Sequence, residues 1–358
     1  MRLAFYAPMK PPDDPVPSGD RSIARSLIAA LSHGGATVDL ASRFRSRDRS
    51  GDAVVQQERM AAAELEVEEL VGTGRDAGWQ AWITYHNYYK APDLIGPGVA
   101  QKLGIPYLQV ESTRARKRLD GPWAAYAQRA EAATDAARVV FFLSERDGET
   151  LHRDAPAGQH LVHLRPFLPE FTLPAASACA GPMLSVGMMR EGDKLASYRI
   201  IAETLARLGD TRWQLDIAGD GPARAEVEAL MVPFGTRVRY HGAVTGDALS
   251  SLYARASLLF WPGVNEALGM VFLEAQAAGL PVVAQNRPGM REVLAPGPYP
   301  ETADGPEGLA RMLATYLSDD SARTAQGRTA RQHVEAHHLL PAATRTLLQG
   351  LALAGVQP

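Results

Sequence analysis

Cysteine is nearly absent from this sequence, since Cys179 is the only one among 358 residues. A single cysteine excludes an intramolecular disulfide, so the composition is not that of a small secreted domain held together by disulfides. Long apolar runs are missing too. No stretch approaches the roughly 20 residues that a membrane-spanning helix requires, and the first residues are too poor in apolar side chains for a signal peptide. We therefore expect a cytoplasmic protein.

An excess of one charge is also lacking, because the formal net charge is only −3. A nucleic-acid binder should carry a clear basic excess, so we expect no nucleic-acid partner. Two arginine-rich stretches, residues 43–49 and 114–118, are local exceptions. They fit solvated loops or helix ends. The alternative is a contact with phosphate or with an anionic membrane, which would place the protein peripherally at the inner face of the membrane.

The length of the chain suits two domains of similar size. Short apolar runs alternate with helical segments in both halves, a pattern typical of doubly wound parallel sheets. We expect an N-terminal domain over residues 1–165, a proline-rich linker over 166–182 and a C-terminal domain over 183–340. The last residues, 341–358, are expected to be helical and to continue a helical tail that starts at residue 321.

A glycine-rich segment, residues 72–78, follows an expected helix over residues 58–71. It superficially suggests a dinucleotide-binding loop. Such a loop must follow a strand and open a helix, whereas this segment follows a helix and precedes the expected strand at 81–85. We therefore interpret residues 72–78 as a turn.

The most informative stretch is residues 257–285, which shows a strand, a loop, a helix and a second strand in sequence. The helix is expected from Met270 to Ala278 and stops at a glycine and a proline. Ligands of such units bind beyond the carboxyl end of the first strand, at the helix N-terminus. Two carboxylates stand there, Glu266 in the loop and Glu274 on the helix. Either one alone would also fit an ordinary surface position.

The pair of glutamates, in the pattern E-x7-E followed by Ala, a small residue, Gly279, Pro281 and Val, resembles the retaining glycosyltransferases of family 4. Specific motifs carry this resemblance through most of the second domain, and only the general pattern carries it in the first. It implies a GT-B architecture, in which two Rossmann-like parallel-sheet domains face each other across a cleft and a C-terminal helix packs back on the first domain.

The resemblance also implies an activity and roles for individual residues. The activity is transfer of a sugar from a nucleotide diphosphate sugar to an acceptor hydroxyl with retention of configuration, through front-face attack within an ion pair. The nucleotide diphosphate sugar is a co-substrate, and no cofactor is expected. In this scheme Glu266 contacts the donor sugar and Glu274 the ribose, while backbone amides of Gly269, Met270 and Val271 assist at the diphosphate.

Further residues acquire roles from the same resemblance. Arg190 and Lys194 follow a strand, where two cations suit a diphosphate leaving group. The family usually has Gly-Arg and Lys-Gly here, so Met188 and Leu195 depart from its pattern, and Arg190 is expected to replace the missing arginine. Three remaining candidates are Val244 at the nucleobase, Gly19 in a loop facing the donor, and His86 beside the donor sugar.

Two other activities fit the same residues. A nucleotide-sugar epimerase of this fold would act without an acceptor, and a non-catalytic protein could bind the nucleotide sugar on a degenerate scaffold. Many glycosyltransferases of other folds hold a divalent cation with an Asp-x-Asp motif, and no two aspartates here stand two residues apart. We therefore expect no metal site and metal-independent transfer.

Overall fold

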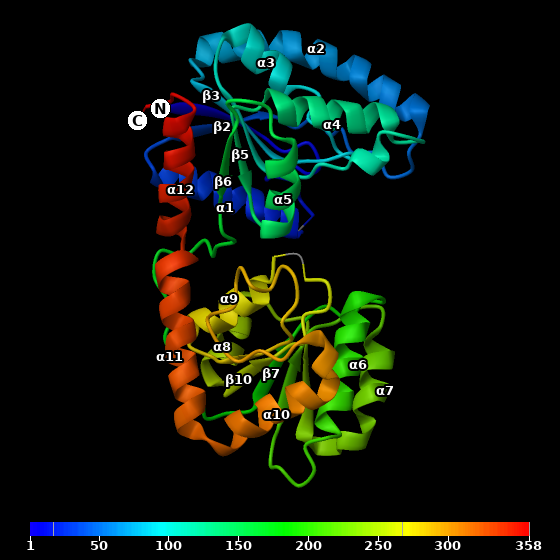
Figure 1. The fold of residues 1–358 in the computed structure, drawn as a ribbon, viewed down its shortest axis with the longest axis vertical. Helices are drawn as coiled ribbons and strands as arrows, with labels where there is room; N and C mark the ends of the chain where they lie inside the picture. Colours follow the sequence, from blue (N-terminus) through cyan, green and yellow to red (C-terminus); the bar gives the residue numbers. More distant parts are fainter. Residues whose placement is uncertain (17, 267, 358) are drawn as a thin grey trace. The chain divides into compact units, whose positions relative to one another are not determined.

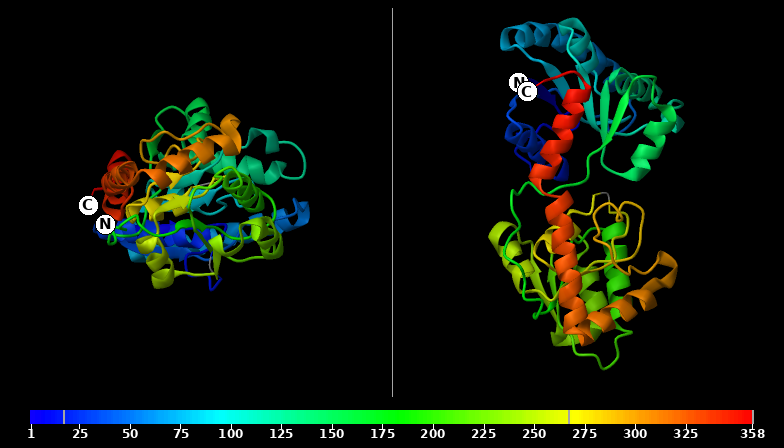
Figure 2. Two further views of the ribbon diagram at one scale, coloured as in Figure 1. Left: turned by 90° about the horizontal axis from the view of Figure 1, so that it is seen from below. Right: turned by 60° about the vertical axis from the view of Figure 1, so that its left-hand side comes forward.

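Two α/β units are present in the computed structural model, which describes residues 1–16, 18–266 and 268–357. Unit 1 comprises Met1–Arg165 and Leu340–Pro358, and unit 2 comprises Pro166–Leu339. Both chain termini therefore belong to unit 1, where the N and C labels lie close together in both views (Figures 1 and 2). In the described part of the chain, no helix combines the length and apolar character that spanning a membrane demands.

Unit 1 is built on a six-stranded parallel sheet with the strand order β2-β1-β3-β4-β5-β6. Its strands are largely buried and apolar, as expected when helices cover both faces of a parallel sheet. The strands are β1 (Arg2–Tyr6), β2 (Thr37–Ser42), β3 (Ala81–Asn87), β4 (Tyr107–Ser112), β5 (Val139–Phe142) and β6 (His160–His163).

The helices of unit 1 are α1 (Gly19–His33), α2 (Ala53–Ala77), α3 (Gly96–Leu103), α4 (Ala124–Ala136), α5 (Glu145–Asp154) and the C-terminal α12 (Leu340–Leu353), with a 3-10 turn at Arg116–Arg118. Helices α2, α3 and α4 pack against one another, and α12 packs against α1 (Figures 1 and 2). The Thr344 hydroxyl on α12 donates to the Ala30 carbonyl of α1 at 2.9 Å. Gly350 lets α12 approach β5, because a Cβ there would lie 2.0 Å from the Phe141 ring.

The interpretation of residues 72–78 as a turn was wrong, because α2 continues to Ala77. Its glycines serve packing and capping instead. A Cβ at Gly74 would lie 2.6 Å from the Leu103 side chain and 2.7 Å from the Trp79 ring, so only glycine lets the helix come this close. Gly78 ends the helix in the left-handed conformation, with φ 71°, and its N–H donates to the Gly74 carbonyl at 3.0 Å.

Unit 2 contains a five-stranded parallel sheet with the order β11-β10-β7-β8-β9. The strands are β7 (Met183–Val186), β8 (Leu215–Ala218), β9 (Val238–Gly242), β10 (Leu258–Phe260) and β11 (Val282–Val283). The helices are α6 (Asp193–Leu205), α7 (Arg224–Met231), α8 (Gly246–Arg255), α9 (Met270–Ala277), α10 (Gly305–Ser318) and α11 (Asp320–His337), with 3-10 segments at Val232–Arg237 and Thr302–Asp304. Helix α6 packs on α7 and α10, and α9 packs on α11 (Figure 1).

The expected continuous helix over residues 321–353 is interrupted between α11 and α12. Pro341 is the second residue of α12 and has no N–H with which to continue the hydrogen-bond ladder of α11. The fully buried His338 occupies the break, and its carbonyl accepts the N–H of Leu168 at 2.8 Å. Leu168 belongs to the expected linker, residues 166–182, and this segment is part of unit 2.

The prediction of two doubly wound parallel-sheet domains is confirmed.

The two glycines of α2 provide a matched stability test. Gly74→Ala should lower the free energy of unfolding by about 1–3 kcal/mol, because its methyl group would overlap Leu103 and Trp79. Gly72→Ala, whose Cβ would meet no atom within 4 Å, should raise it by about 0.5–1 kcal/mol through the helix propensity of alanine. Urea unfolding measures both, and equal effects of the two substitutions would contradict the packing argument.

Candidate functional site

The unit 2 sheet has a topological switch point at β7, where the order in which the chain adds strands changes from one side of the sheet to the other. Strands β8 and β9 lie on one side of β7, and β10 and β11 lie on the other. The loops that follow β7 and β10, described over residues 187–192 and 261–266, therefore lead away from each other at neighbouring strands. Ligands of open α/β sheets bind in the crevice that such a divergence creates.

Glu266 from the loop after β10 and Lys194 from the first turn of α6 form an ion pair. The Lys194 ammonium contacts Oε1 of Glu266, and the indole Nε1 of Trp261 donates to the same oxygen at 2.8 Å. The ammonium also lies 5.3 Å from the centre of a Trp261 ring, within range of a cation–π contact. Two donors thus converge on Oε1, whereas Oε2 makes no hydrogen bond within the described residues.

Trp261 is a site residue that the sequence interpretation missed. Its ring packs edge-on against Tyr198, with 5.2 Å between the ring centres. The Tyr198 hydroxyl donates to the Gly187 carbonyl at 2.7 Å, and a Cβ at Gly187 would lie 2.5 Å from the Trp261 ring. Gly187 is therefore required for the backbone after β7 to approach the indole. The available signal was an aromatic residue directly before Pro262-Gly263 at a strand end.

The loop after β10 makes two further hydrogen bonds with the first two turns of α6. The Asn265 amide donates to Oδ1 of Asp193 at 2.9 Å, and the Val264 N–H donates to the Ser197 hydroxyl at 3.2 Å. Asn265 adopts φ 47°, a left-handed conformation that is uncommon outside glycine but tolerated best by Asn and Asp. These contacts hold Glu266 against the helix that carries Lys194.

Helix α9 begins at the same edge of the sheet. Gly269 precedes it with φ 59°, and a Cβ there would lie 2.9 Å from the Val293 side chain, so both conformation and space require glycine. The helix proper starts at Met270 and Val271, whose N–H groups make no hydrogen bond within the described residues, whereas those of Phe272 and Leu273 donate to the Gly269 carbonyl. They form the positive end of the helix dipole.

Glu274 lies on the second turn of α9 and is largely withdrawn from solvent. The Tyr253 hydroxyl, from α8, donates to its Oε2 at 2.7 Å. Burial raises the pKa of Glu274, the hydrogen bond from Tyr253 lowers it, and the charge of Glu170 raises it, so that the net shift is upward. Tyr253 is almost fully buried and was not identified from the sequence.

Arg190 lies in the loop after β7, and Val244 lies in the loop after β9. The Arg190 side chain is exposed, with no hydrogen bond or ion pair to any described residue. Its loop is anchored by the buried Met189, whose N–H donates to the Asp220 carbonyl at 2.9 Å. Val244 follows β9 and packs partly on the unit 2 core. Of the two departures from the family pattern, Leu195 is a core residue, whereas Met188 is 52% exposed.

The two candidates from the first domain, Gly19 and His86, lie at the carboxyl edge of the unit 1 sheet. Gly19 is the first residue of α1, next to Ser18, which caps the helix by accepting the Arg21 N–H at 3.3 Å. His86 is near the end of β3, and its Nδ1 lies 3.1 Å from Oδ1 of Asp20.

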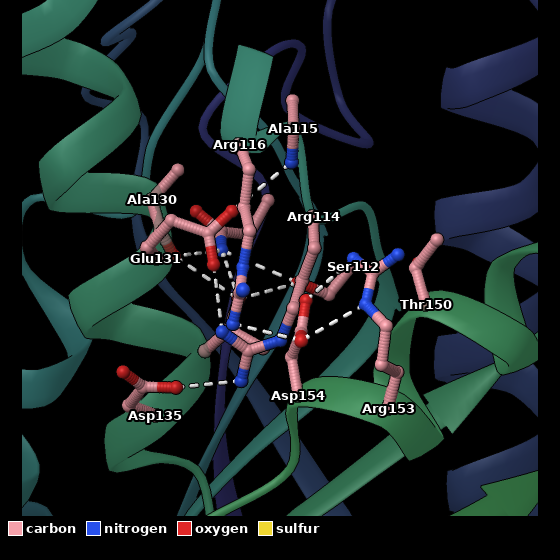
Figure 3. Close-up of polar contacts among 12 residues, drawn as sticks. Ser112, Arg114, Ala115, Arg116, Ala130, Glu131, Asp135, Thr150, Arg153 and Asp154 are labelled. Carbon is pink, nitrogen blue, oxygen red and sulfur yellow. Dashed lines mark hydrogen bonds and ion pairs between the residues drawn. The ribbon is translucent and has the colours of Figure 1, made fainter. Parts of the chain in front are cut away.

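Two of the four cations in the stretch at residues 114–118 are paired with carboxylates of unit 1 (Figure 3). The buried Arg114 side chain contacts Oε2 of Glu131 and Oδ1 of Asp135, each at 2.6 Å. Arg116 contacts Asp154 at 2.7 Å, and Asp154 also accepts from Arg153. A membrane contact by this stretch stays a prediction, and these partners leave it with fewer cations than the sequence suggests.

The raised pKa of Glu274 predicts a pH-dependent effect of Glu274→Gln. A carboxyl whose folded pKa exceeds its ordinary value of 4.5 contributes its stability below that value and loses it as the pH rises through the folded pKa. Glutamine keeps an acceptor for Tyr253 and buries no charge. The free energy of unfolding of the variant, relative to wild type, should therefore increase from about pH 4 to about pH 8 in urea titrations. A difference that stays constant or decreases would contradict the burial argument. Glu191→Gln, at an exposed position, controls for loss of one charge.

Known proteins similar to this chain were found by sequence and by structure. Residues 182–319 match the family model for glycosyl transferases group 1. The sulfoquinovosyl transferase SQD2 of Arabidopsis thaliana is 30% identical over 159 residues, which are 42% of this chain and 29% of that protein. A D-inositol 3-phosphate glycosyltransferase of Streptomyces avermitilis is 27% identical over 284 residues, 70% of this chain and 61% of that protein.

The match to solved structures concerns the fold. A sucrose-phosphate synthase from Thermosynechococcus elongatus superposes with a TM-score of 0.68 at 18% identity, covering 97% of both chains. The chain spans less than two thirds of the length of either relative named above. Its second unit therefore resembles the group 1 glycosyltransferases, and its two units together have a fold similar to that of the solved structure.

Proposed function

We propose that this protein is a retaining glycosyltransferase that moves a sugar from a nucleotide diphosphate sugar to an acceptor hydroxyl. The observation that carries the proposal is the Lys194–Glu266 pair, which stands at the switch point of the unit 2 sheet beside the N-terminus of α9. A cation, a carboxylate and a positive helix end are thus collected at one sheet edge, where a charged, hydroxylated ligand would find partners for each of its parts.

The diphosphate would be held by positive groups of unit 2. Arg190 has no internal partner among the described residues and can turn entirely to a ligand. Lys194 is shared with Glu266, so its ammonium would bridge the carboxylate and a phosphate oxygen. The first turn of α9, from Met270 and Val271, would add N–H donors. These groups would stabilise charge on the diphosphate as it leaves.

Glu266 would hold the donor sugar through its unused oxygen. Because Oε1 already accepts from Lys194 and Trp261, Oε2 is left to accept a sugar hydroxyl. Two donors on one oxygen also make the carboxylate a poorer nucleophile, since its negative charge is already drawn into hydrogen bonds. This arrangement supports retention without a covalent intermediate, by front-face attack of the acceptor within an ion pair.

Glu274 would bind the ribose hydroxyls of the nucleotide. Its Oε2 is occupied by Tyr253, which leaves Oε1 for the ligand and fixes the orientation of the carboxyl plane. Val244 would contact the nucleobase from the loop after β9. The roles of Gly19 and His86 at the donor stay predictions.

Nucleotide binding without a metal tests the proposed function directly. In excess EDTA, at least one of UDP, GDP and ADP should raise the melting temperature, because a ligand that binds only the folded state stabilises it. The corresponding nucleotide sugar should support transfer that added magnesium hardly changes, since fixed protein groups meet the diphosphate charge. Absence of any shift would contradict the donor site, and activity abolished by chelator and restored by magnesium or manganese would contradict this account of the leaving group.

The two kinds of contact predict different kinetic effects. Lys194→Ala and Glu266→Ala should each lower kcat by roughly a hundredfold or more, because both groups would stabilise charge that develops in the transition state. Glu274→Ala should mainly raise the KM for the donor, since a ribose contact exists equally in ground and transition states. Steady-state kinetics distinguishes them. Near wild-type turnover in the first two variants, or an unchanged donor KM in the third, would reject the corresponding assignment.

A further inference from the structure

The amino edge of the unit 2 sheet, where its strands begin, carries a hollow that the proposed function does not use. The hollow is lined by residues at the starts of β7, β8, β9 and β10 and by the turn from α10 to α11, at the lower end of unit 2 in Figure 1. Because the strands of this sheet are parallel, this edge is opposite to the one where Lys194 and Glu266 meet. The volume of the hollow is about 980 Å³, which is enough for a small molecule.

Two arginines of the lining have guanidinium groups that are free to bind a ligand. Arg212 precedes β8 and Arg237 precedes β9, and both are exposed. Neither side chain makes an ion pair or a hydrogen bond within the described residues. The Arg237 guanidinium lies 4.3 Å from the centre of a Trp213 ring, a cation–π contact that leaves its N–H donors unused. The planar donors of arginine match the oxygen atoms of a phosphate.

Two buried polar groups of the same lining lack a partner. Trp213 is 5% exposed and Ser257 is 4% exposed. In the part of the chain that the structure describes, neither the indole Nε1 nor the serine Oγ makes a hydrogen bond. An unsatisfied buried donor is destabilising, so a ligand that accepts from it stabilises the folded protein. The exposed Arg237 lies over the indole, and its guanidinium can turn aside to let a ligand oxygen reach the N–H.

The charges around the hollow favour an anion. Arg323 adds a third guanidinium, which donates to the Cys179 carbonyl at 2.8 Å and pairs with Oδ1 of Asp320 at 2.7 Å. Asp210 is the other carboxylate among the described residues of the lining, and it is exposed. Since Asp320 already offsets Arg323, two unpaired guanidinium groups face one unpaired carboxylate.

We propose that this hollow, the amino-edge site, binds the phosphate group of a small phosphorylated molecule. Arg212 and Arg237 bind the phosphate oxygens, the Trp213 N–H and the Ser257 hydroxyl donate to the same group, and Leu317 contacts the rest of the molecule. A phosphate suits these groups better than a carboxylate, because it offers more acceptor oxygens and a larger negative charge. The amino-edge site is separate from the proposed donor site and does not depend on the proposed function.

The first experiment follows the indole N–H of Trp213 by proton–nitrogen-15 NMR in the full chain. The chain has five tryptophans, and the signal lost in Trp213→Phe identifies the one of interest. Inorganic phosphate, added at constant ionic strength, should shift this signal to lower field in a saturable manner, because the N–H gains an acceptor. Arg212→Gln and Arg237→Gln should each weaken the apparent affinity by about tenfold or more, since each removes a charge-assisted contact.

The control for this titration is Arg190→Gln, which removes an exposed arginine at the opposite edge of the sheet. It should leave the titration of Trp213 unchanged. The Trp261 indole reports the candidate donor site independently, because it belongs to that site. Absence of a saturable Trp213 shift, a response of Trp261 alone, or equal weakening by Arg190→Gln overturns the proposal.

The second experiment uses Ser257→Ala, a small change that removes one buried hydroxyl. Without ligand, the variant should have a higher urea midpoint than wild type, because an unsatisfied polar group is lost. Phosphate should raise the midpoint less in the variant than in wild type, because one donor to the ligand is missing. A lower midpoint without ligand, or an increase with phosphate equal to that of wild type, overturns the serine contact.

The third experiment distinguishes the sources of the anion. Glycerol 3-phosphate should shift the Trp213 signal at concentrations no higher than inorganic phosphate requires, and acetate should bind at least about tenfold more weakly. Vesicles of phosphatidylcholine with phosphatidic acid should sediment wild type and Arg212→Gln to the same extent. Acetate binding as tight as phosphate binding, or sedimentation with phosphatidic acid that Arg212→Gln abolishes, overturns the assignment to a small phosphorylated molecule.

Discussion

The unit 2 site depends on one oxygen atom, Oε1 of Glu266, which accepts hydrogen bonds from both the Lys194 ammonium and the Trp261 indole. This contact joins the connection after β10 to the helix that follows β7, across the point where the sheet changes direction. Because both donors are used on one oxygen, the other is left for a ligand. In the proposed function, the same contact would divide the charge of Lys194 between Glu266 and a diphosphate, so that the carboxylate balances the ammonium before the ligand binds.

Glycines make this contact sterically possible. The absence of a side chain at Gly187 leaves room for the Trp261 indole. Gly219 is required in turn for the backbone to pass close to Gly187, since a Cβ at Gly219 would lie 1.9 Å from the Gly187 carbonyl oxygen. Gly269 fulfils the same requirement at the start of α9. These residues contribute no chemical group, yet a methyl at any of them would displace the backbone around the loop that carries Glu266 and the helix that carries Lys194. The candidate functional side chains can therefore take up their positions only because the surrounding backbone positions are glycines.

Much of the fold could be predicted from the sequence, for a physical reason. A buried parallel strand is a short apolar run, and the helix that follows it begins after a loop rich in small or polar residues. The sequence of residues 257–285 therefore predicts β10, α9 and β11. The glycine-rich end of α2 was wrongly predicted as a turn because glycine has a low helix propensity. Gly74 is instead required by its close packing against Trp79 and Leu103, and the contact with Leu103, which is distant in sequence, cannot be inferred from local sequence. The break between α11, which ends at His337, and α12 was not predicted, although Pro341 is a residue type that indicates such a break.

The candidate site could be predicted in its charged members but not in their neighbours. Glu266, Glu274 and Lys194 stand in a recognisable spacing, and contact geometry was not needed to suspect them. Trp261 and Tyr253 act by touching one specific oxygen, and such a contact is a property of the folded chain alone. Glu274 shows why these neighbours matter. Without the Tyr253 hydroxyl its buried carboxyl would have one partner fewer, and its pKa would lie higher still, which would favour the protonated form. In the proposed ribose contact, a hydroxyl would donate better to a carboxylate than to a neutral acid, so the tyrosine would keep the glutamate closer to the state that binds.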